Sequence, residues 1–303
     1  MLESTSSPSS ADEVRTRLKI QSPNIGPLML AAPAASIIGV FFAMPALVML
    51  RMSFNRHADG RIYIPDWTLA NYVRLISDPF YVSSIAYTSV LAATVAVVTV
   101  VLAYPYSLCI WRSGSTRRVL LMGLALLPLL ISEVSTIVGW QLFFPRSGFL
   151  SALLSGLGIA QGRFSLMFTF TAAVLGVTYI TLPFAIWILV STLDRLDRRL
   201  IEASADLGAP PAMTFREVLL PLTKGGILVA FAQAFIWAMG TYATPSALGP
   251  DWLWTIGLET YRQMNSWQNW PFASALTFLL ASSITAIMLL LRVAGPRQGK
   301  YHA

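Results

Sequence analysis

The chain has 303 residues, of which 55% are hydrophobic and only 12% are charged. A soluble domain carries about 25% charged residues because they cover its surface, so this composition excludes one or two soluble domains. It equally excludes a disordered chain. The single cysteine, Cys109, excludes a disulfide framework and a cysteine-based zinc site. The net charge of +7 would suggest nucleic acid in a soluble protein, so its distribution along the chain has to be examined.

Six apolar runs are long enough to cross a bilayer, which requires roughly 20 helical residues. They cover residues 27–50, 83–110, 119–144, 166–190, 225–243 and 272–291. The runs are long and continuous, whereas the strands of a membrane barrel are short and alternate. We therefore expect an all-α membrane protein with six transmembrane helices, forming one domain over residues 27–291. The first run is too long for the apolar region of a secretory signal, so we interpret it as a retained span.

The positive charge is unequally divided between the two sides of the predicted membrane domain. With the N-terminus inside, 14 lysines and arginines fall in the inner segments and 7 in the outer ones. Because short cytoplasmic loops carry the excess of Lys and Arg, both termini are predicted to be cytoplasmic. Residues 1–26, rich in serine, then form a cytoplasmic tail that we expect to be disordered, and residues 292–303 form a second cytoplasmic tail. The charge thus indicates topology rather than nucleic-acid binding.

The inner loop at residues 191–222 differs from every other loop. Ten charged residues fall between Asp194 and Lys224. Apolar side chains recur there at helical spacing, which predicts an amphipathic helix over residues 193–207 with an Asp194–Arg198 pair on its surface; they are Leu193, Leu196, Leu200, Ala203 and Leu207.

The same loop contains strong signals for a break. Gly208 stands where a glycine C-cap is expected, and Pro210-Pro211 prevents simple continuation of the helix. Residues 214–220 can form a second short helix that ends before Pro221. A helix, a sharp break and a second helix on the cytoplasmic face predict a protein-docking element.

These residues also carry a family resemblance. Glu202-Ala203-Ser204, followed after three residues by Gly208 and after nine more by Val218-Leu219-Leu220-Pro221, resembles the EAA loop of ABC-importer permeases. The pattern there is Glu-Ala-Ala, Gly and Ile-x-Leu-Pro at the same spacings. Asn71-Tyr72-Val73-Arg74, Thr181-Leu182-Pro183-Phe184 and Phe215 are similar to the spermidine/putrescine-type subgroup, and the resemblance covers residues 27–291.

The resemblance implies a function for the loop and a set of partners. The loop would be a coupling helix that docks into a cytoplasmic ATPase dimer, which itself binds ATP and Mg²⁺, so that no cofactor is expected in this chain. A second homologous permease and an extracytoplasmic solute-binding protein would complete a complex in the bacterial inner membrane. Glu202 would pair with basic groups of the ATPase, or alternatively only support its own helix through Arg198 or Arg199. The implied coupling residues are Glu202, Ala203, Ser204, Asp206, Gly208, Pro210, Phe215 and Pro221.

Glu133 is the one acidic residue within a predicted span. An intramembrane carboxylate is costly and normally faces the bundle interior or a cavity, where it would stabilise a passing cation such as a polyamine. The alternative is that Glu133 lies at a helix break after Pro128 and bonds to freed backbone or a neighbouring serine. Polar and aromatic residues that could line the same path, or simply hold helices together, give a candidate substrate path of Glu133, Trp140, Tyr179, Gln233, Trp237 and Tyr242.

Features of other protein classes are missing from the sequence. There is no phosphate-binding Gly-x-x-x-x-Gly-Lys-[Ser/Thr] motif, so ATP hydrolysis is expected in a separate subunit. The two histidines, His57 and His302, provide no metal or catalytic constellation, so we expect that the chain is not an enzyme. Two alternatives stay open: an importer for another solute (an opine, thiamine, iron or an amino-acid-like compound), or an ion-coupled secondary transporter, for which one acid and no visible repeat are poor support.

Overall fold

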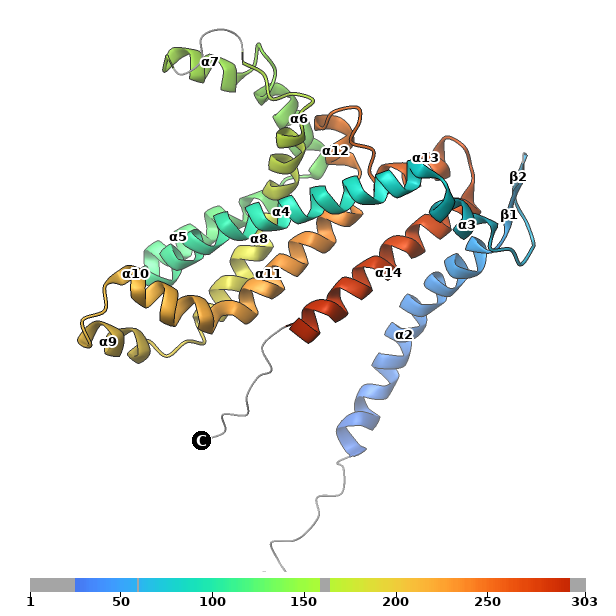
Figure 1. Ribbon diagram of the computed structural model, residues 1–303. Coiled ribbons are helices and arrows are strands. Elements are labelled where there is room, and N and C mark those ends of the chain that lie inside the picture. The colour runs from blue at the N-terminus through green and yellow to red at the C-terminus, as the bar shows by residue number, and fades with distance from the viewer. Residues whose placement is uncertain (1–24, 59, 159–163, 295–303) are drawn as a thin grey trace, which may run out of the picture. The chain divides into compact units, whose positions relative to one another are not determined.

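The computed structural model describes residues 25–58, 60–158 and 164–294 (Figure 1). In this part of the chain, five helices are long and apolar enough to cross a membrane, or six if one bent helix pair counts as a single span. The five single helices are α2 (Ile25–Ser53), α4 (Pro79–Arg112), α8 (Phe170–Leu193), α11 (Leu220–Gly240) and α14 (Trp270–Ala294). The expected all-α membrane architecture is confirmed. The predicted tails lie outside the described residues, except for the residues that open α2 and close α14.

The chain divides into two compact units, one ending at Met49 and the other beginning at Leu50. The described part of the first unit is α2 as far as Met49, and it contains Pro33 and Pro45 without interruption of the helix. The last residues of α2, from Leu50 to Ser53, belong to the second unit. The second unit carries every other element and is described by itself below.

The core of the second unit is the packing of α4, α8 and α11 (Figure 1). Small residues such as Ala92, Ala173 and Ala234 are fully buried where these helices approach one another. Two hydroxyl pairs also join the helices: Thr99 and Thr181 at 2.8 Å, and Tyr104 and Thr223 at 2.8 Å. Small residues that allow close approach, with polar side chains that hydrogen-bond across the interface, are typical of helices packed in a membrane.

Adjacent glycines in α11 provide a matched test of this packing. A Cβ added at Gly226 would overlap the side chain of Thr192 on α8, whereas a Cβ at Gly225 would meet nothing within 4 Å. We expect Gly226→Ala to destabilise the protein by about 1–3 kcal/mol through overpacking. Gly225→Ala should be neutral or stabilising by up to ~1 kcal/mol, because alanine favours the helix. Thermal unfolding in detergent measures both, and equal melting temperatures for the two variants would contradict the packing described.

The third predicted span, over residues 119–144, is not one continuous helix. Helix α5 (Ser115–Leu126) runs into a 3₁₀ turn, η1 (Leu127–Leu130), and α6 (Glu133–Phe143) then leaves at an angle of 97°. The third span is therefore a bent helix pair, with the break after Pro128 that the sequence offered as an alternative. Pro128 has no N–H to donate, and Ile131 and Ser132 have ψ values of 131° and 142°, which are extended.

Shorter elements lie at the ends of the long helices. Gly60, with a φ of +77°, lies between the strands of an antiparallel hairpin that the sequence did not predict. Arg51 joins the two ends of this hairpin, because it donates hydrogen bonds to the Asn55 side chain before β1 and to the Asp66 carbonyl after β2. The short elements are β1 (Arg56–Ala58), β2 (Arg61–Ile64), α3 (Ala70–Ser77), α7 (Phe149–Gly156), α12 (Ala243–Leu248) and α13 (Ile256–Asn265).

The loop between α8 and α11 contains the predicted break, but its helices have different limits. Helix α8 continues to Leu193, and α9 covers only Arg199–Asp206. The prediction of one amphipathic helix over residues 193–207 was therefore wrong. Residues 194–198 form turns between the two helices, and the Asp197 carboxylate accepts a hydrogen bond from the Arg199 N–H at the start of α9.

The predicted Asp194–Arg198 pair is also absent. The Asp194 carboxylate accepts instead from Arg118 at 2.5 Å, while Arg198 donates to the Trp111 carbonyl at 3.0 Å. Asp194 therefore contacts the first turn of α5, and Arg198 contacts the last turn of α4.

The second short helix does not end before Pro221. Helix α10 (Pro211–Thr214) passes through a π-helical turn, η2 (Phe215–Leu219), directly into α11. Pro221 is tolerated because it occupies the first turn of α11. The segment that follows the Pro210-Pro211 break is therefore continuous with α11, a helix long enough to cross a membrane.

Candidate functional site

The turn after α9 is a complete glycine cap. Gly208 has a φ of +78°, which confirms the predicted left-handed position. Its N–H donates to the Ala205 carbonyl at 2.9 Å, and the Ala209 N–H donates to the Ser204 carbonyl at 3.1 Å. These two bonds are the Schellman pattern, which satisfies carbonyls at the helix end. The turn thus fixes the direction in which the chain leaves α9.

A side-chain hydrogen bond closes the two arms of this turn. The hydroxyls of Ser204 on α9 and Thr214 on α10 lie 2.9 Å apart. Thr214 is buried, while Ser204 is half-buried. The bond joins residues ten positions apart across the Pro210-Pro211 break, so it ties α9 to the start of the helix that becomes α11.

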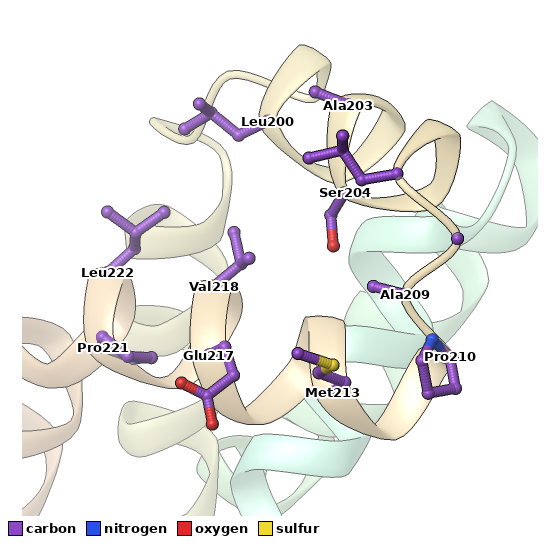
Figure 2. A pocket seen from close by; sticks show the side chains of 12 residues that line it. Leu200, Ala203, Ser204, Ala209, Pro210, Met213, Glu217, Val218, Pro221 and Leu222 are labelled. Carbon is purple, nitrogen blue, oxygen red and sulfur yellow. The ribbon is translucent and has the colours of Figure 1, made fainter.

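An open groove of about 620 Å³ lies between the two arms (Figure 2). Leu200, Ala203 and Ser204 approach it from α9, and Val218 and Leu222 face them from the opposite arm (Figure 2). Its walls also include predicted coupling residues, namely Ala203, Ser204, Gly208, Pro210 and Pro221. The apolar lining is exposed, so this groove is a surface suited to docking rather than a closed core.

Acidic side chains border the exposed side of the loop. Glu202 and Asp206 are four residues apart on α9, and both are exposed, as is Glu217 near the groove. Glu202 forms no ion pair with Arg198 or Arg199 in the part of the chain that the structure describes. Leu207, between these acids and the cap, is 88% exposed. The surface thus offers negative charge and an apolar residue side by side to a partner.

The base of the loop is fixed to the transmembrane helices. The Arg198 guanidinium lies 5.0 Å from the centre of the Trp111 ring, and Arg118 pairs with Asp194. Phe215 makes an edge contact with Tyr104 of α4, with ring centres 5.7 Å apart. Force applied to the loop would therefore reach both α4 and α11.

The candidate path residues are brought together only in part. Glu133 is exposed in the first turn of α6, where its carboxylate accepts from the Thr244 hydroxyl at 3.0 Å. A break after Pro128 is confirmed, but the partner is this distant threonine rather than a neighbouring serine. Two turns further along α6, the Trp140 ring makes an edge contact with the Tyr179 ring, with ring centres 5.7 Å apart.

The remaining candidates lie along α11 and beyond it. Trp237 packs against Phe184 at 5.5 Å, while Tyr242 stacks on Tyr261 at 4.7 Å beside a hollow of about 480 Å³. The buried Gln233 Oε1 and Trp140 Nε1 atoms have no hydrogen-bond partner within the described residues. Buried polar atoms without a partner are uncommon in folded proteins, so these two atoms stand out among the polar groups of the candidate path.

Comparison with known proteins decides the family. Residues 110–300 match the family described as "Binding-protein-dependent transport system inner membrane component". The chain is 30% identical over 251 residues to the spermidine/putrescine transport system permease protein PotB of Escherichia coli (strain K12), covering 83% of this chain and 90% of that protein. The chain belongs to this family. It is an inner-membrane ABC permease, and the predicted resemblance is confirmed.

Other relatives agree with this assignment. The permease is 29% identical over 271 residues to the inner membrane ABC transporter permease protein YdcU of Escherichia coli (strain K12), covering 85% of this chain and 86% of that one. A bacterial alginate ABC transporter, solved in complex with an alginate pentasaccharide-bound periplasmic protein, superposes with a TM-score of 0.70 at 17% identity. That match covers 91% of the permease and 96% of the other chain and shows a common fold.

Several contacts of the predicted site residues could not be predicted from the sequence. Thr244 contacts Glu133, Tyr261 contacts Tyr242, and Thr214 contacts Ser204 across the Pro210-Pro211 break. Nothing in the local pattern marks them, because such pairings depend on how α6, α10, α12 and α13 are placed. Thr214 is the exception, because a polar residue close to a predicted helix break is a signal that the sequence does contain.

The Ser204–Thr214 bond gives a testable contribution to the loop. We expect Ser204→Ala and Thr214→Val each to reduce the local stability of α9 by about 0.5–1.5 kcal/mol, the usual net value of one hydrogen bond. Hydrogen exchange of the α9 amides in the purified permease measures this effect. In the double variant the losses should not add, since both changes remove the same bond. Fully additive losses would show that the two hydroxyls act independently.

Proposed function

We propose that this permease is the membrane-spanning subunit of an ATP-driven importer, coupled through the α9 groove to a separate pair of ATPase subunits. The observation that carries the proposal is the exposed groove with its capped turn, acidic border and fixed base. A docking element needs an accessible contact surface, and a transmitter of motion needs stiffness. The Gly208 turn and the contacts of Arg198, Asp194 and Phe215 support both requirements. In this arrangement ATP and Mg²⁺ are bound by the partner, and this chain needs no cofactor.

The expected topology places the loop in the cytoplasm. Helices α9 and α10, which contribute to the groove, lie at the same end of the core as the turn between α4 and α5 (Figure 1). That turn carries Arg112, Arg117 and Arg118. Since positive loops stay inside, we infer that this end and both termini are cytoplasmic. A second homologous permease and an extracytoplasmic solute-binding protein complete the proposed complex, which the periplasmic protein seen with the alginate transporter supports.

For the solute we propose a polyamine or a similar cationic amine. The relative at 30% identity is named for spermidine and putrescine. Glu133 offers an exposed carboxylate at the break between η1 and α6, and Trp140, Tyr179, Trp237 and Tyr242 add aromatic surface. A cation is attracted by a carboxylate and by aromatic faces alike. Import of another solute, or ion-coupled transport, remains the alternative.

Identification of the bound solute tests this proposal. The complex is purified with its solute-binding protein, and small molecules released from that protein are identified by mass spectrometry. We expect a linear or branched amine with at least one positive charge. Release of a neutral sugar or an anion as the sole specific ligand would contradict the proposed solute class, while leaving the permease assignment intact.

A further inference from the structure

A second hollow, separate from the coupling groove, lies at the turn between α4 and α5. Its volume is about 500 Å³. Its lining includes two arginines, Arg112 and Arg117, and two apolar residues, Pro105 and Leu108. The hollow therefore combines two cationic side chains with an apolar wall, at the end of a helix that is long enough to span a membrane.

The two arginines of this hollow are not neutralised by the protein. Neither Arg112 nor Arg117 forms an ion pair within the described residues, and both are exposed. Their neighbour Arg118 differs, because it pairs with Asp194. Arg198 is also engaged, since it lies on the Trp111 ring. The hollow thus faces outward with two uncompensated positive charges.

An exposed apolar stripe leads along α4 to the same place. Val97, Val101, Pro105 and Arg112 follow one another at intervals of four, four and seven residues, which places them on one helix face. Val97 is 52% exposed and Val101 is 62% exposed. From Val97 to Pro105 the stripe is about 12 Å long at 1.5 Å per residue. One leaflet contributes about half of a hydrocarbon core roughly 30 Å thick, so the stripe matches an acyl chain in depth.

We infer that this hollow binds the headgroup of an anionic phospholipid, with Arg112 and Arg117 on the phosphate and an acyl chain along the stripe. Basic residues at the membrane surface attract anionic lipid, and basic pockets at helix ends hold such headgroups. A free phosphate would use the two arginines but not the apolar stripe. The charge and the stripe together fit one molecule that has an anionic head and a long apolar tail.

Lipid retention by the intact complex tests the inference. The complex with its ATPase subunits is placed in detergent with equal amounts of phosphatidylglycerol and phosphatidylcholine, and native mass spectrometry records which lipid is retained. The unchanged complex should prefer phosphatidylglycerol. In Arg112→Gln/Arg117→Gln that preference should fall by about 30-fold, because each arginine near an anionic surface contributes about fivefold. The matched control, Arg195→Gln, removes an exposed arginine of the same membrane face outside the hollow and should keep the preference.

Three results would overturn the inference. The first is an unchanged preference in the double variant. The second is loss of phosphatidylglycerol from the unchanged complex on addition of millimolar inorganic phosphate, to the same extent as in the double variant. That result would identify a site for a free anion. The third is loss of the ATPase subunits from the double variant with no change in lipid retention, which would assign these arginines to a protein interface.

Discussion

Replacing Gly208 with valine should abolish solute uptake, while the permease still inserts and assembles. Gly208 has a φ of +78°, a conformation that costs an L-residue roughly 1–2 kcal/mol and a β-branched side chain more. The turn would relax toward negative φ and lose the bonds from Gly208 to Ala205 and from Ala209 to Ser204. Helix α9 would then no longer be held at a fixed angle to α10. Uptake by cells or proteoliposomes measures the loss, and membrane fractionation measures assembly.

A matched glycine separates turn geometry from the size of the new side chain. A Cβ at Gly208 would meet nothing within 4 Å, so crowding does not explain the expected effect. Gly123 in α5 is equally open but has an ordinary backbone conformation. Gly123→Val should therefore retain most of the uptake. Full uptake by Gly208→Val would refute the role of this turn in coupling.

Replacing Glu133 with glutamine should weaken uptake of a cationic solute by about tenfold, equivalent to ~1.4 kcal/mol. The amide can still accept from the Thr244 hydroxyl, which lies 3.0 Å from the carboxylate oxygen. The loss would therefore come from charge alone. The expected loss of ~1.4 kcal/mol is smaller than the attraction of roughly 4 kcal/mol between opposite charges about 4 Å apart near a protein surface. We expect the smaller value because Glu133 is exposed in this chain.

Thr244→Val distinguishes charge from hydrogen bonding at the same site. It removes the hydroxyl and leaves the Glu133 carboxylate in place, so uptake should fall less than in Glu133→Gln. Initial rates over a range of solute concentrations show whether the loss lies in apparent affinity, as we expect. Unchanged uptake by Glu133→Gln would remove this residue from the substrate path.

The long spans could be predicted from sequence because hydrophobic length alone decides them. Helices α4 and α14 extend only two to four residues beyond the apolar runs that predicted them. The third span could not be predicted in its true form. Pro128 indicates a break, but the 97° angle depends also on the extended conformation of Ile131 and Ser132, which the residue types do not specify.

In the loop over residues 191–222, likewise, features that depend on local residues could be predicted, and features that depend on tertiary contacts could not. Gly208 and Pro210-Pro211 act through their own backbone, so the break they predict is present. The limits of α9 depend on partners outside the loop. Asp194 and Arg198 were predicted to pair because they are four residues apart, but Arg118 and the Trp111 carbonyl compete successfully for them. Sequence spacing cannot show such competition.

The energy source of uptake is the most direct test of the central proposal. The permease is reconstituted into liposomes with its ATPase, second permease and solute-binding protein, and uptake of labelled spermidine is followed with ATP inside or outside. We predict that ATP on the side of the α9 groove is required and that ionophores which collapse ion gradients have no effect. Uptake that persists without ATP and stops when the gradient collapses would contradict the account.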